Sequence, residues 1–170
     1  MKTLFSRMIR AARFDANTYE QVEADRGTTA AAVFIVIAAS LAAALGSGAR
    51  DIGSLFGVTI VLLMTWVVWV VLTYIIGTRL FPEPQTHADW GELFRTTGFS
   101  ASPGVLRLFG LIPGLTLPVF FGITVWMLLT FIVAVRQALD YASSARALAV
   151  CILGWFIQSV LFFAFVKVAI

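Results

Sequence analysis

Long apolar runs, separated by short polar segments, make up most of the sequence from residue 28 onward. Five runs can be distinguished, at about residues 28–46, 52–77, 94–112, 115–135 and 145–168. Each is close to the roughly 20 residues that a helix needs to cross the core of a bilayer. The pattern therefore predicts an all-α, polytopic membrane protein with five transmembrane helices, of which the third is the least cleanly apolar.

The residues before the first run have a different pattern. Over residues 3–14, apolar and basic side chains fall on different sides of a helix. The apolar face comprises Leu4, Phe5, Met8, Ile9 and Ala12, and the basic residues off that face are Lys2, Arg7, Arg10 and Arg13. Such an amphipathic helix is expected to lie at the membrane interface, in the headgroup plane. The alternative is a short helix packed on the protein's own cytoplasmic face.

A short acidic segment joins this helix to the first run. Asn17 and Glu20 have capping-box spacing, which predicts the start of a helix. Its carboxylates could pair with the basic helix or be solvated in an elbow beside the membrane. Residues 1–27 are thus predicted to form a cytoplasmic segment, and residues 28–170 the transmembrane domain.

The composition excludes several other protein classes. Hydrophobic residues make up 60% and charged residues 12% of the 170 residues, against about 45–50% and 25% in an average soluble domain. A soluble fold of this size cannot bury so much apolar surface, so a soluble enzyme and a disordered protein are excluded. The single cysteine excludes an internal disulfide, and a net charge of +3 is too small and too scattered to indicate nucleic-acid binding.

The basic residues are distributed unevenly over the predicted loops. With the N-terminus inside, nine lie on the cytoplasmic side and two outside, which follows the positive-inside rule. The nine are Lys2, Arg7, Arg10, Arg13, Arg26, Arg79, Arg95, Arg136 and Arg146, and the two are Arg50 and Lys167. The distribution predicts a cytoplasmic N-terminus and a C-terminus outside.

The third run contains features that are unusual for a membrane helix. Pro103 removes a backbone donor and is expected to kink the helix. Ser100 and Ser102 can help to satisfy the carbonyl groups that the proline frees.

The same run contains Arg107, which is predicted to lie inside the membrane. It comes twelve residues after Arg95, roughly 18 Å deeper along a helix, and a charge at that depth is costly. Arg107 could snorkel to the outer headgroups or bind a lipid phosphate. It could also pair with Gln158 or Asp51, or serve transport or catalysis.

Two loops contain capping signals. Thr86 and Asp89 predict a helix start that places His87 in the first turn, as a solvated residue rather than a ligand. After the fourth run, Arg136 and Asp140 have the i, i+4 spacing of a pair on one helical face. This pair is expected to stabilise the short loop, with partner binding as the alternative.

The fifth run also begins with a capping signal. Ser144 is expected to cap the helix that starts there.

Several of these motifs together resemble a known family. They are the elbow Asp15–Glu20, the stretch Tyr74–Arg79, the third-run stretch Asp89–Phe99 with Ser102-Pro103-Gly104, the pair Ile112-Pro113, and the fourth-run exit Ala134–Asp140. From about Arg10 onward, the combination is similar to prokaryotic members of the Yip family, small five-span proteins related to eukaryotic Ypt/Rab-interacting proteins.

The resemblance implies five membrane helices, a cytoplasmic N-terminus and, for a prokaryotic member, the inner membrane. In eukaryotic members it implies small GTPases and other family members as partners. The long cytoplasmic N-terminal region of those members is missing here, so GTPase binding is not carried over. The prokaryotic branch implies no established reaction.

The sequence contains no motif for hydrolysis, phosphoryl transfer, metal binding or cofactor binding. We therefore expect a non-enzymatic scaffold that organises the membrane through helix packing, as a homo-oligomer or with other membrane proteins, and through lipid binding. Small residues at Ala30–Ala44 and Gly98–Gly104 are expected to form its packing faces. The predicted lipid- or partner-binding residues are Arg7, Arg10, Arg13, Arg95, Arg107, Arg136, Asp140 and Gln158.

The alternative is a small transporter, channel or lipid scramblase that uses Arg107 in the third run. An intramembrane enzyme is a third possibility, for which the sequence offers no catalytic constellation.

Overall fold

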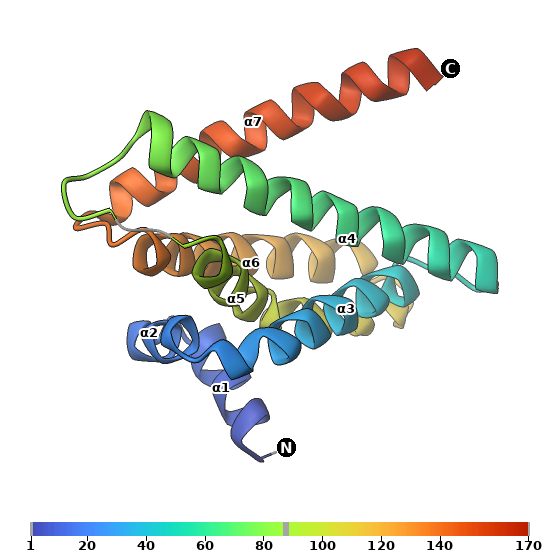
Figure 1. Ribbon diagram of the computed structural model, residues 1–170. Coiled ribbons are helices and arrows are strands. Elements are labelled where there is room, and N and C mark those ends of the chain that lie inside the picture. Colours follow the sequence, from blue (N-terminus) through green and yellow to red (C-terminus); the bar gives the residue numbers. More distant parts are fainter. Residues whose placement is uncertain (1, 87–88, 170) are drawn as a thin grey trace.

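The computed structural model describes residues 2–86 and 89–169, and every regular element in this part of the chain is a helix (Figure 1). The all-α prediction is confirmed. The predicted position of His87 lies outside the described residues.

Two short helices precede the long ones. The chain turns between α1 (Lys2–Ala12) and α2 (Ala16–Ala24) at Phe14, whose φ is 65°. Asp15 caps α2, because its Oδ1 accepts a hydrogen bond of 3.1 Å from the backbone N–H of Asn17. The prediction of a cap at Asn17 is therefore wrong by two residues. The 3₁₀ turn η1 (Arg26–Thr28) then leads into the first long helix.

Four helices in the described part of the chain are long and apolar enough to cross a membrane, as expected of a multi-pass membrane protein. They correspond to the first, second, fourth and fifth apolar runs. They are α3 (Thr29–Gly46), α4 (Ile52–Ile75) with its π-helical extension η2 (Ile76–Leu80), α6 (Thr116–Ala138) and α7 (Ser144–Ala169).

The third run was predicted as one helix with a kink at Pro103. It divides instead into α5 (Trp90–Ser100) and the 3₁₀ segment η3 (Ser102–Leu111). The break comes at Pro103, which cannot donate a hydrogen bond to the carbonyl of Phe99. The hydroxyl of Ser102 donates to that carbonyl at 2.6 Å, which confirms the role predicted for Ser102. Ser100 donates instead to the carbonyl of Thr97, at 2.7 Å.

The broken segment α5–η3 runs beside α3 from Ala32 to Gly46, in the same direction. Gly98 lies against Ala32, Gly104 against Ala39, and Gly110 against Gly46. A Cβ added at Gly98 or Gly104 would lie only 2.7 or 2.8 Å from the facing alanine Cβ. The two small-residue stretches therefore pack on each other within the chain, rather than forming free faces for a partner.

Two clusters of buried side chains form the core. One lies among α4, η2, α5, α6 and α7 and includes Val70 and Val150. The other joins α1, α2, α3, α5 and α6 and includes Ile35 and Phe99. Trp66 of α4 packs against both clusters, so it links the two halves of the bundle. α4 and α7 lie close together near the start of α7 and diverge toward the C-terminus (Figure 1).

Candidate functional site

Arg107 of η3 is held at the point where η3 packs on α3. Its backbone lies directly against Gly46, where no side chain would fit. The guanidinium Nη2 donates a hydrogen bond of 2.9 Å to Oγ1 of Thr124, and the guanidinium carbon lies 5.5 Å from the ring centroid of Phe120. Phe120 and Thr124 are one turn apart on α6, so α6 positions the guanidinium.

The Arg107 side chain points into the bundle and not toward its nearer end. Its backbone is level with Gly46 at the end of α3, whereas the cavity that it lines is bordered by Ser40 and Val36. These residues lie six and ten positions earlier in α3, about 9 and 15 Å along the helix. Snorkelling of Arg107 to the outer headgroups, or its binding of a lipid phosphate, stays a prediction.

The cavity beside Arg107 has a volume of about 70 Å³. Its apolar lining comes from Val36, Ala39, Leu62, Ala101 and Met127, and its polar lining from Ser40, Trp66 and Arg107. Nε of Arg107 and Nε1 of Trp66 are covered by surrounding atoms and have no hydrogen-bond partner in the structure.

Neither sequence-predicted partner reaches Arg107. Gln158 donates a hydrogen bond of 3.2 Å from Nε2 to the carbonyl of Thr65 on α4. Asp51 caps α4 and accepts hydrogen bonds from the backbone N–H and the hydroxyl of Ser54, at 2.9 and 2.7 Å. The predicted pairing of Arg107 with Gln158 or Asp51 is therefore wrong. No described carboxylate forms an ion pair with Arg107.

Arg95 binds the end of α2. Its side chain is only 5% exposed, and Nε donates to the carbonyls of Val22 and Glu23 at 3.1 and 3.2 Å, with a further hydrogen bond from Nη2 to Glu23. These are carbonyl groups of the last turn of α2, where a positive charge also interacts favourably with the helix dipole. Arg95 thus ties the third run to the N-terminal helices, and its assignment to lipid or partner binding stays a prediction.

The arginines of α1 have different environments. Arg7 forms an ion pair with Asp25, with 3.3 Å between Nη1 and Oδ2, so one of the predicted contacts between the basic and acidic segments is present. The Nε of Arg10 is buried without a partner, and Arg13 is exposed. Binding of lipid by these residues stays a prediction.

Arg136 and Asp140 do not form the predicted helical pair. α6 ends at Ala138, and Asp140 lies beyond it with a φ of 52°. The guanidinium of Arg136 instead donates to the carbonyls of Tyr141 and Ala142, at 3.3 and 3.4 Å. Arg136 therefore stabilises the loop as expected, but through carbonyl groups and not through a carboxylate.

Ser143, and not Ser144, accepts a hydrogen bond from a backbone N–H at the start of α7. The backbone N–H of Ala145 donates to the Ser143 hydroxyl at 3.2 Å. The prediction that Ser144 caps this helix is wrong by one residue.

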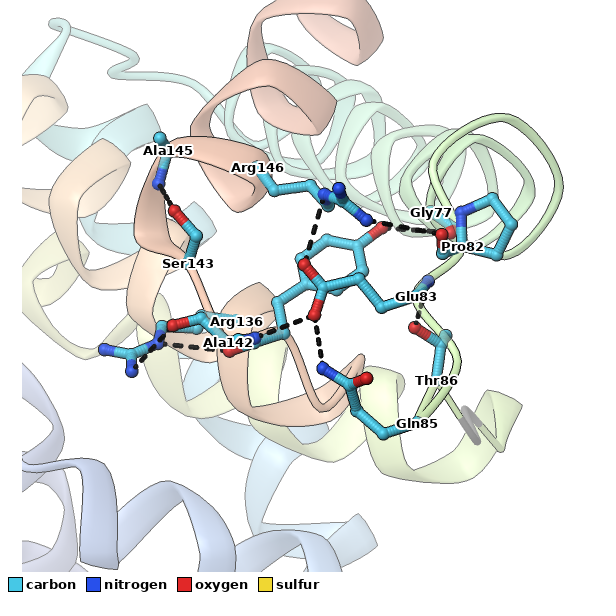
Figure 2. Close-up of polar contacts among 11 residues, drawn as sticks. Gly77, Pro82, Glu83, Gln85, Thr86, Arg136, Ala142, Ser143, Ala145 and Arg146 are labelled. Atoms are coloured by element: carbon cyan, nitrogen blue, oxygen red, sulfur yellow. Dashed lines mark hydrogen bonds and ion pairs between the residues drawn. The ribbon is translucent and has the colours of Figure 1, made fainter.

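Glu83 is a central residue that sequence reasoning missed. Figure 2 shows its carboxylate between the α4–α5 loop and the α6–α7 loop. Oε1 lies 3.1 Å from Nε of Arg146, and Oε2 accepts a hydrogen bond of 3.0 Å from the backbone N–H of Ala142 and another from Gln85. Its side chain is 9% exposed. No spacing rule connects Glu83 with residues so distant in sequence, so the sequence contains no signal for this contact.

The α4–α5 loop also corrects the predicted start of the third run. Asp89 and Glu92 form a capping box at the start of α5. The hydroxyl of Thr86 accepts a hydrogen bond of 2.9 Å from the backbone N–H of Glu83. Thr86 is thus part of the loop and does not cap the helix.

An acidic cavity of about 280 Å³ lies at the same end of the bundle as these loops. It is lined by Glu20, Glu23, Ala24, Glu92, Gln137 and Asp140. Burial raises the pKa of Glu23 to about 7, and the neighbouring carboxylates of Glu92, Asp140 and Glu20 contribute to the increase, while Arg95 opposes it. The acidic segment of residues 15–25 was visible in the sequence, but its approach to Glu92 and Asp140 was not.

Comparisons of the chain with protein-family models, with curated proteins and with solved structures find no match. The resemblance to the Yip family therefore rests on its sequence motifs alone. In the described part of the chain, no group of three or more histidine, cysteine, aspartate or glutamate side chains has an arrangement that could hold a metal ion.

Proposed function

We propose that this protein is a five-span, Yip-like membrane protein that organises the membrane through helix packing and lipid binding without catalysing a reaction. The observation that carries the proposal is the contrast in burial among the four long helices. In the most apolar stretch of α3, 50% of the residues are buried within the chain. The corresponding share is 11% for α4 and 22% for each of α6 and α7. The apolar sides of α4, α6 and α7 must therefore be covered by lipid or by helices of other chains.

The position of α5–η3 supports a fifth crossing. The segment lies beside α3 from Ala32 to Gly46. Its 11 α-helical and 10 3₁₀ residues extend for about 36 Å if collinear, at about 1.5 and 2.0 Å per residue. This length exceeds the roughly 30 Å of a bilayer core. Five crossings place the two termini on opposite sides, in agreement with the distribution of basic residues.

The surface of α1 supports a location at the interface. Leu4 and Met8 pack against the buried cluster of α2, α3 and α5. Phe5 and Ile9, on the adjoining side of the helix, are 66% and 38% exposed. A helix that is held to the bundle on one side and presents aromatic and aliphatic groups on the next is suited to lie in the headgroup region, with Arg13 near anionic lipid.

Cysteine accessibility tests the number of crossings. In a Cys151→Ala background, Arg50→Cys and Ala142→Cys should react with impermeant reagent from opposite sides of the membrane. If α5–η3 returned to its own side, both cysteines would react from the same side and the five-span proposal would be overturned.

Native mass spectrometry in mild detergent tests the scaffold function. We expect an oligomer, retained phospholipid, or both. A strict monomer that retains no lipid would contradict the proposal.

A transporter, channel or lipid scramblase is the second candidate. The observation that favours it is the conjunction of a broken membrane segment with the Arg107 cavity, because discontinuous helices commonly form substrate sites in transporters. Reconstituted liposomes provide the test. Lipid flip or solute flux that is present in the wild type and lost in Arg107→Leu would support it, and flux unchanged by the substitution would remove this role for Arg107.

A further inference from the structure

The two N-terminal helices, α1 and α2, are held to each other by contacts of their own. The hydroxyl of the buried Tyr19 on α2 donates a hydrogen bond of 3.1 Å to the carbonyl of Ala11 in α1. Arg7 of α1 forms an ion pair with Asp25, the residue that follows α2. We call α1 and α2 together the N-terminal unit, because these contacts let the two helices move as one body.

Three side chains of α5 and α6 form the polar contacts between the N-terminal unit and these two helices in the described part of the chain. None of these contacts is an ion pair. Local opening that breaks a few contacts costs less free energy than unfolding the whole bundle, so the docking of the unit is sensitive to small changes in charge. The contacts run from Arg95 to the carbonyls of Val22 and Glu23, from Gln137 to the Glu20 carboxylate at 2.9 Å, and from the Trp126 indole N–H to the carbonyl of Ala12 at 2.7 Å.

Carboxylates from three parts of the chain face one another where the N-terminal unit docks. Glu20 and Glu23 of α2, Glu92 of α5 and Asp140 after α6 line one cavity of about 280 Å³. They are four of the nine acidic residues in the chain, so the docked unit concentrates negative charge at this interface. Arg95 of α5 is the cation that acts on Glu23, but its guanidinium donates to backbone carbonyls.

The other elements packed on α2 offer little to neutralise this cluster. α6 presents the neutral Gln137 at the cavity. The groups that shift the pKa of Glu23 include no described basic side chain of α1 or η1, namely none of Arg7, Arg10, Arg13 and Arg26. The repulsion among the four carboxylates is therefore offset by Arg95 and by the uptake of a proton.

We propose that the N-terminal unit is a pH-sensitive latch, which docks firmly on α5 and the α6–α7 loop when Glu23 carries a proton and loosens when Glu23 is ionised. A protonated Glu23 leaves three negative charges around the cavity instead of four. Burial, followed by the carboxylates of Glu92, Asp140 and Glu20, raises the pKa of Glu23 to about 7, while Arg95 opposes the increase. The latch consists of contacts within the chain, so it does not depend on the proposed membrane function.

The direction of the effect follows from proton binding. When the unit is undocked, Glu23 is solvated and its pKa returns toward the ordinary value of about 4.5. Between these two pKa values the docked form binds more protons than the undocked form, so docking weakens as the pH increases. Above about pH 7, Glu23 is ionised in both forms, and further increases have no effect through this residue.

Hydrogen exchange of the full chain in one non-titrating detergent tests the latch. Exchange rates of the backbone amides are measured at about pH 5, 6, 7 and 8 and corrected for the known effect of pH on the exchange chemistry itself. The ratio of open to closed forms is then compared between the amides of the N-terminal unit and those of α6. A local latch changes this ratio in the N-terminal unit, whereas global unfolding changes it equally in all helices.

The variants remove carboxylates one at a time with little change in shape. Glu23→Gln removes the proton-binding group. Glu92→Gln keeps the capping box of α5, because glutamine also serves at that position, and Asp140→Asn suits the φ of 52° found there. Asp51→Asn is the matched control, because Asp51 is exposed outside the cluster and asparagine also caps a helix.

We expect the open fraction of the N-terminal unit to increase about ten-fold or more between pH 5 and pH 7 in the wild type, and to level off above pH 7. The increase should be absent in Glu23→Gln and smaller in Glu92→Gln and Asp140→Asn, because a neighbouring negative charge is lost. Asp51→Asn should behave as the wild type does.

Other results would overturn the latch. These are exchange in the N-terminal unit that does not change with pH, an increase that persists in Glu23→Gln, or an equal increase in α6. If Glu23→Gln does not fold, Glu92→Gln and Asp140→Asn decide the question by the same comparison with Asp51→Asn. Failure of the latch would leave the proposed membrane function intact, because that function is tested by the number of crossings and by oligomer and lipid in native mass spectrometry.

Discussion

Glu83 and Arg146 join two loops that are remote in sequence, with 3.1 Å between Oε1 of the glutamate and Nε of the arginine (Figure 2). The glutamate is the more buried partner, with 9% of its side chain exposed against 40% for the arginine. Its second oxygen accepts the backbone N–H of Ala142. This carboxylate therefore connects the end of the α4 helix, with its π-helical extension, to the start of α7.

Replacing either Glu83 or Arg146 should destabilise the protein. Glu83→Ala removes the ion pair and the hydrogen bonds of a largely buried carboxylate, which we expect to cost about 1–3 kcal/mol. Arg146→Ala leaves that carboxylate, which is 9% exposed, without its counter-ion, so it should cost a similar amount. Thermal unfolding in one detergent would measure both, with the exposed Arg79→Ala as control. Equal, negligible effects of all three would show that the loop contact does not contribute to stability.

Replacing Arg95 should release α2 from the bundle. Arg95→Met leaves the carbonyls of Val22 and Glu23 without their buried donor, which we expect to cost about 2–4 kcal/mol. Hydrogen exchange should increase mainly in α2 and α1. Arg13→Met, at an exposed position, is the matched control and should leave the exchange rates unchanged. Uniform exchange changes throughout the chain would contradict a local capping role.

Alanine at the contact between α3 and α5 should destabilise the bundle. Gly98→Ala places a Cβ 2.7 Å from the Cβ of Ala32, so the helices must separate, at a cost of about 1–3 kcal/mol. Gly122→Ala on α6 is the control, because nothing lies within 4 Å of the added Cβ there. Helix propensity alone favours alanine at both positions, by about 0.5–1 kcal/mol. Chemical denaturation should therefore give changes of opposite sign, and stabilisation by both substitutions would refute the close contact.

The stability of the protein should decrease as the pH increases from about 4.5 to about 7. Over this range Glu23 is protonated in the folded state, where its pKa is raised to about 7, but ionised in the unfolded state. The folded state therefore binds more protons, and its stability decreases with increasing pH until both states are ionised. Glu23→Gln should remove the pH dependence of stability that comes from Glu23. The difference between the unfolding midpoints of the variant and the wild type should therefore change with pH. Parallel curves for the two proteins over this range would contradict the raised pKa.

The pattern of apolar runs was sufficient to predict much of the architecture. Four of the five predicted runs are long apolar helices, because a segment that crosses a bilayer must satisfy its backbone groups internally and present an apolar surface. The kink at Pro103 and the role of Ser102 also followed from local chemistry, since a missing donor and a nearby hydroxyl act over a few residues.

Positions of helix caps were less predictable. Asp15 and Asp89 cap α2 and α5, where Asn17 and Thr86 had been expected. Several polar residues near a helix start can each act as its N-cap, because each has the residue type that capping requires. The conformation of the loop decides which of them accepts the hydrogen bond.

Hydropathy along the chain is sufficient to identify an all-helical membrane protein with an arginine in its third apolar run. The contacts of that arginine depend on the packing of η3 against α3 and α6. Arg107 points into a cavity beside Trp66 instead of pairing with Gln158. Hydropathy and helical spacing depend on neighbours within one or two turns. The contacts of Arg107 and Glu83 instead join elements that are remote along the chain, so they depend on how whole helices pack.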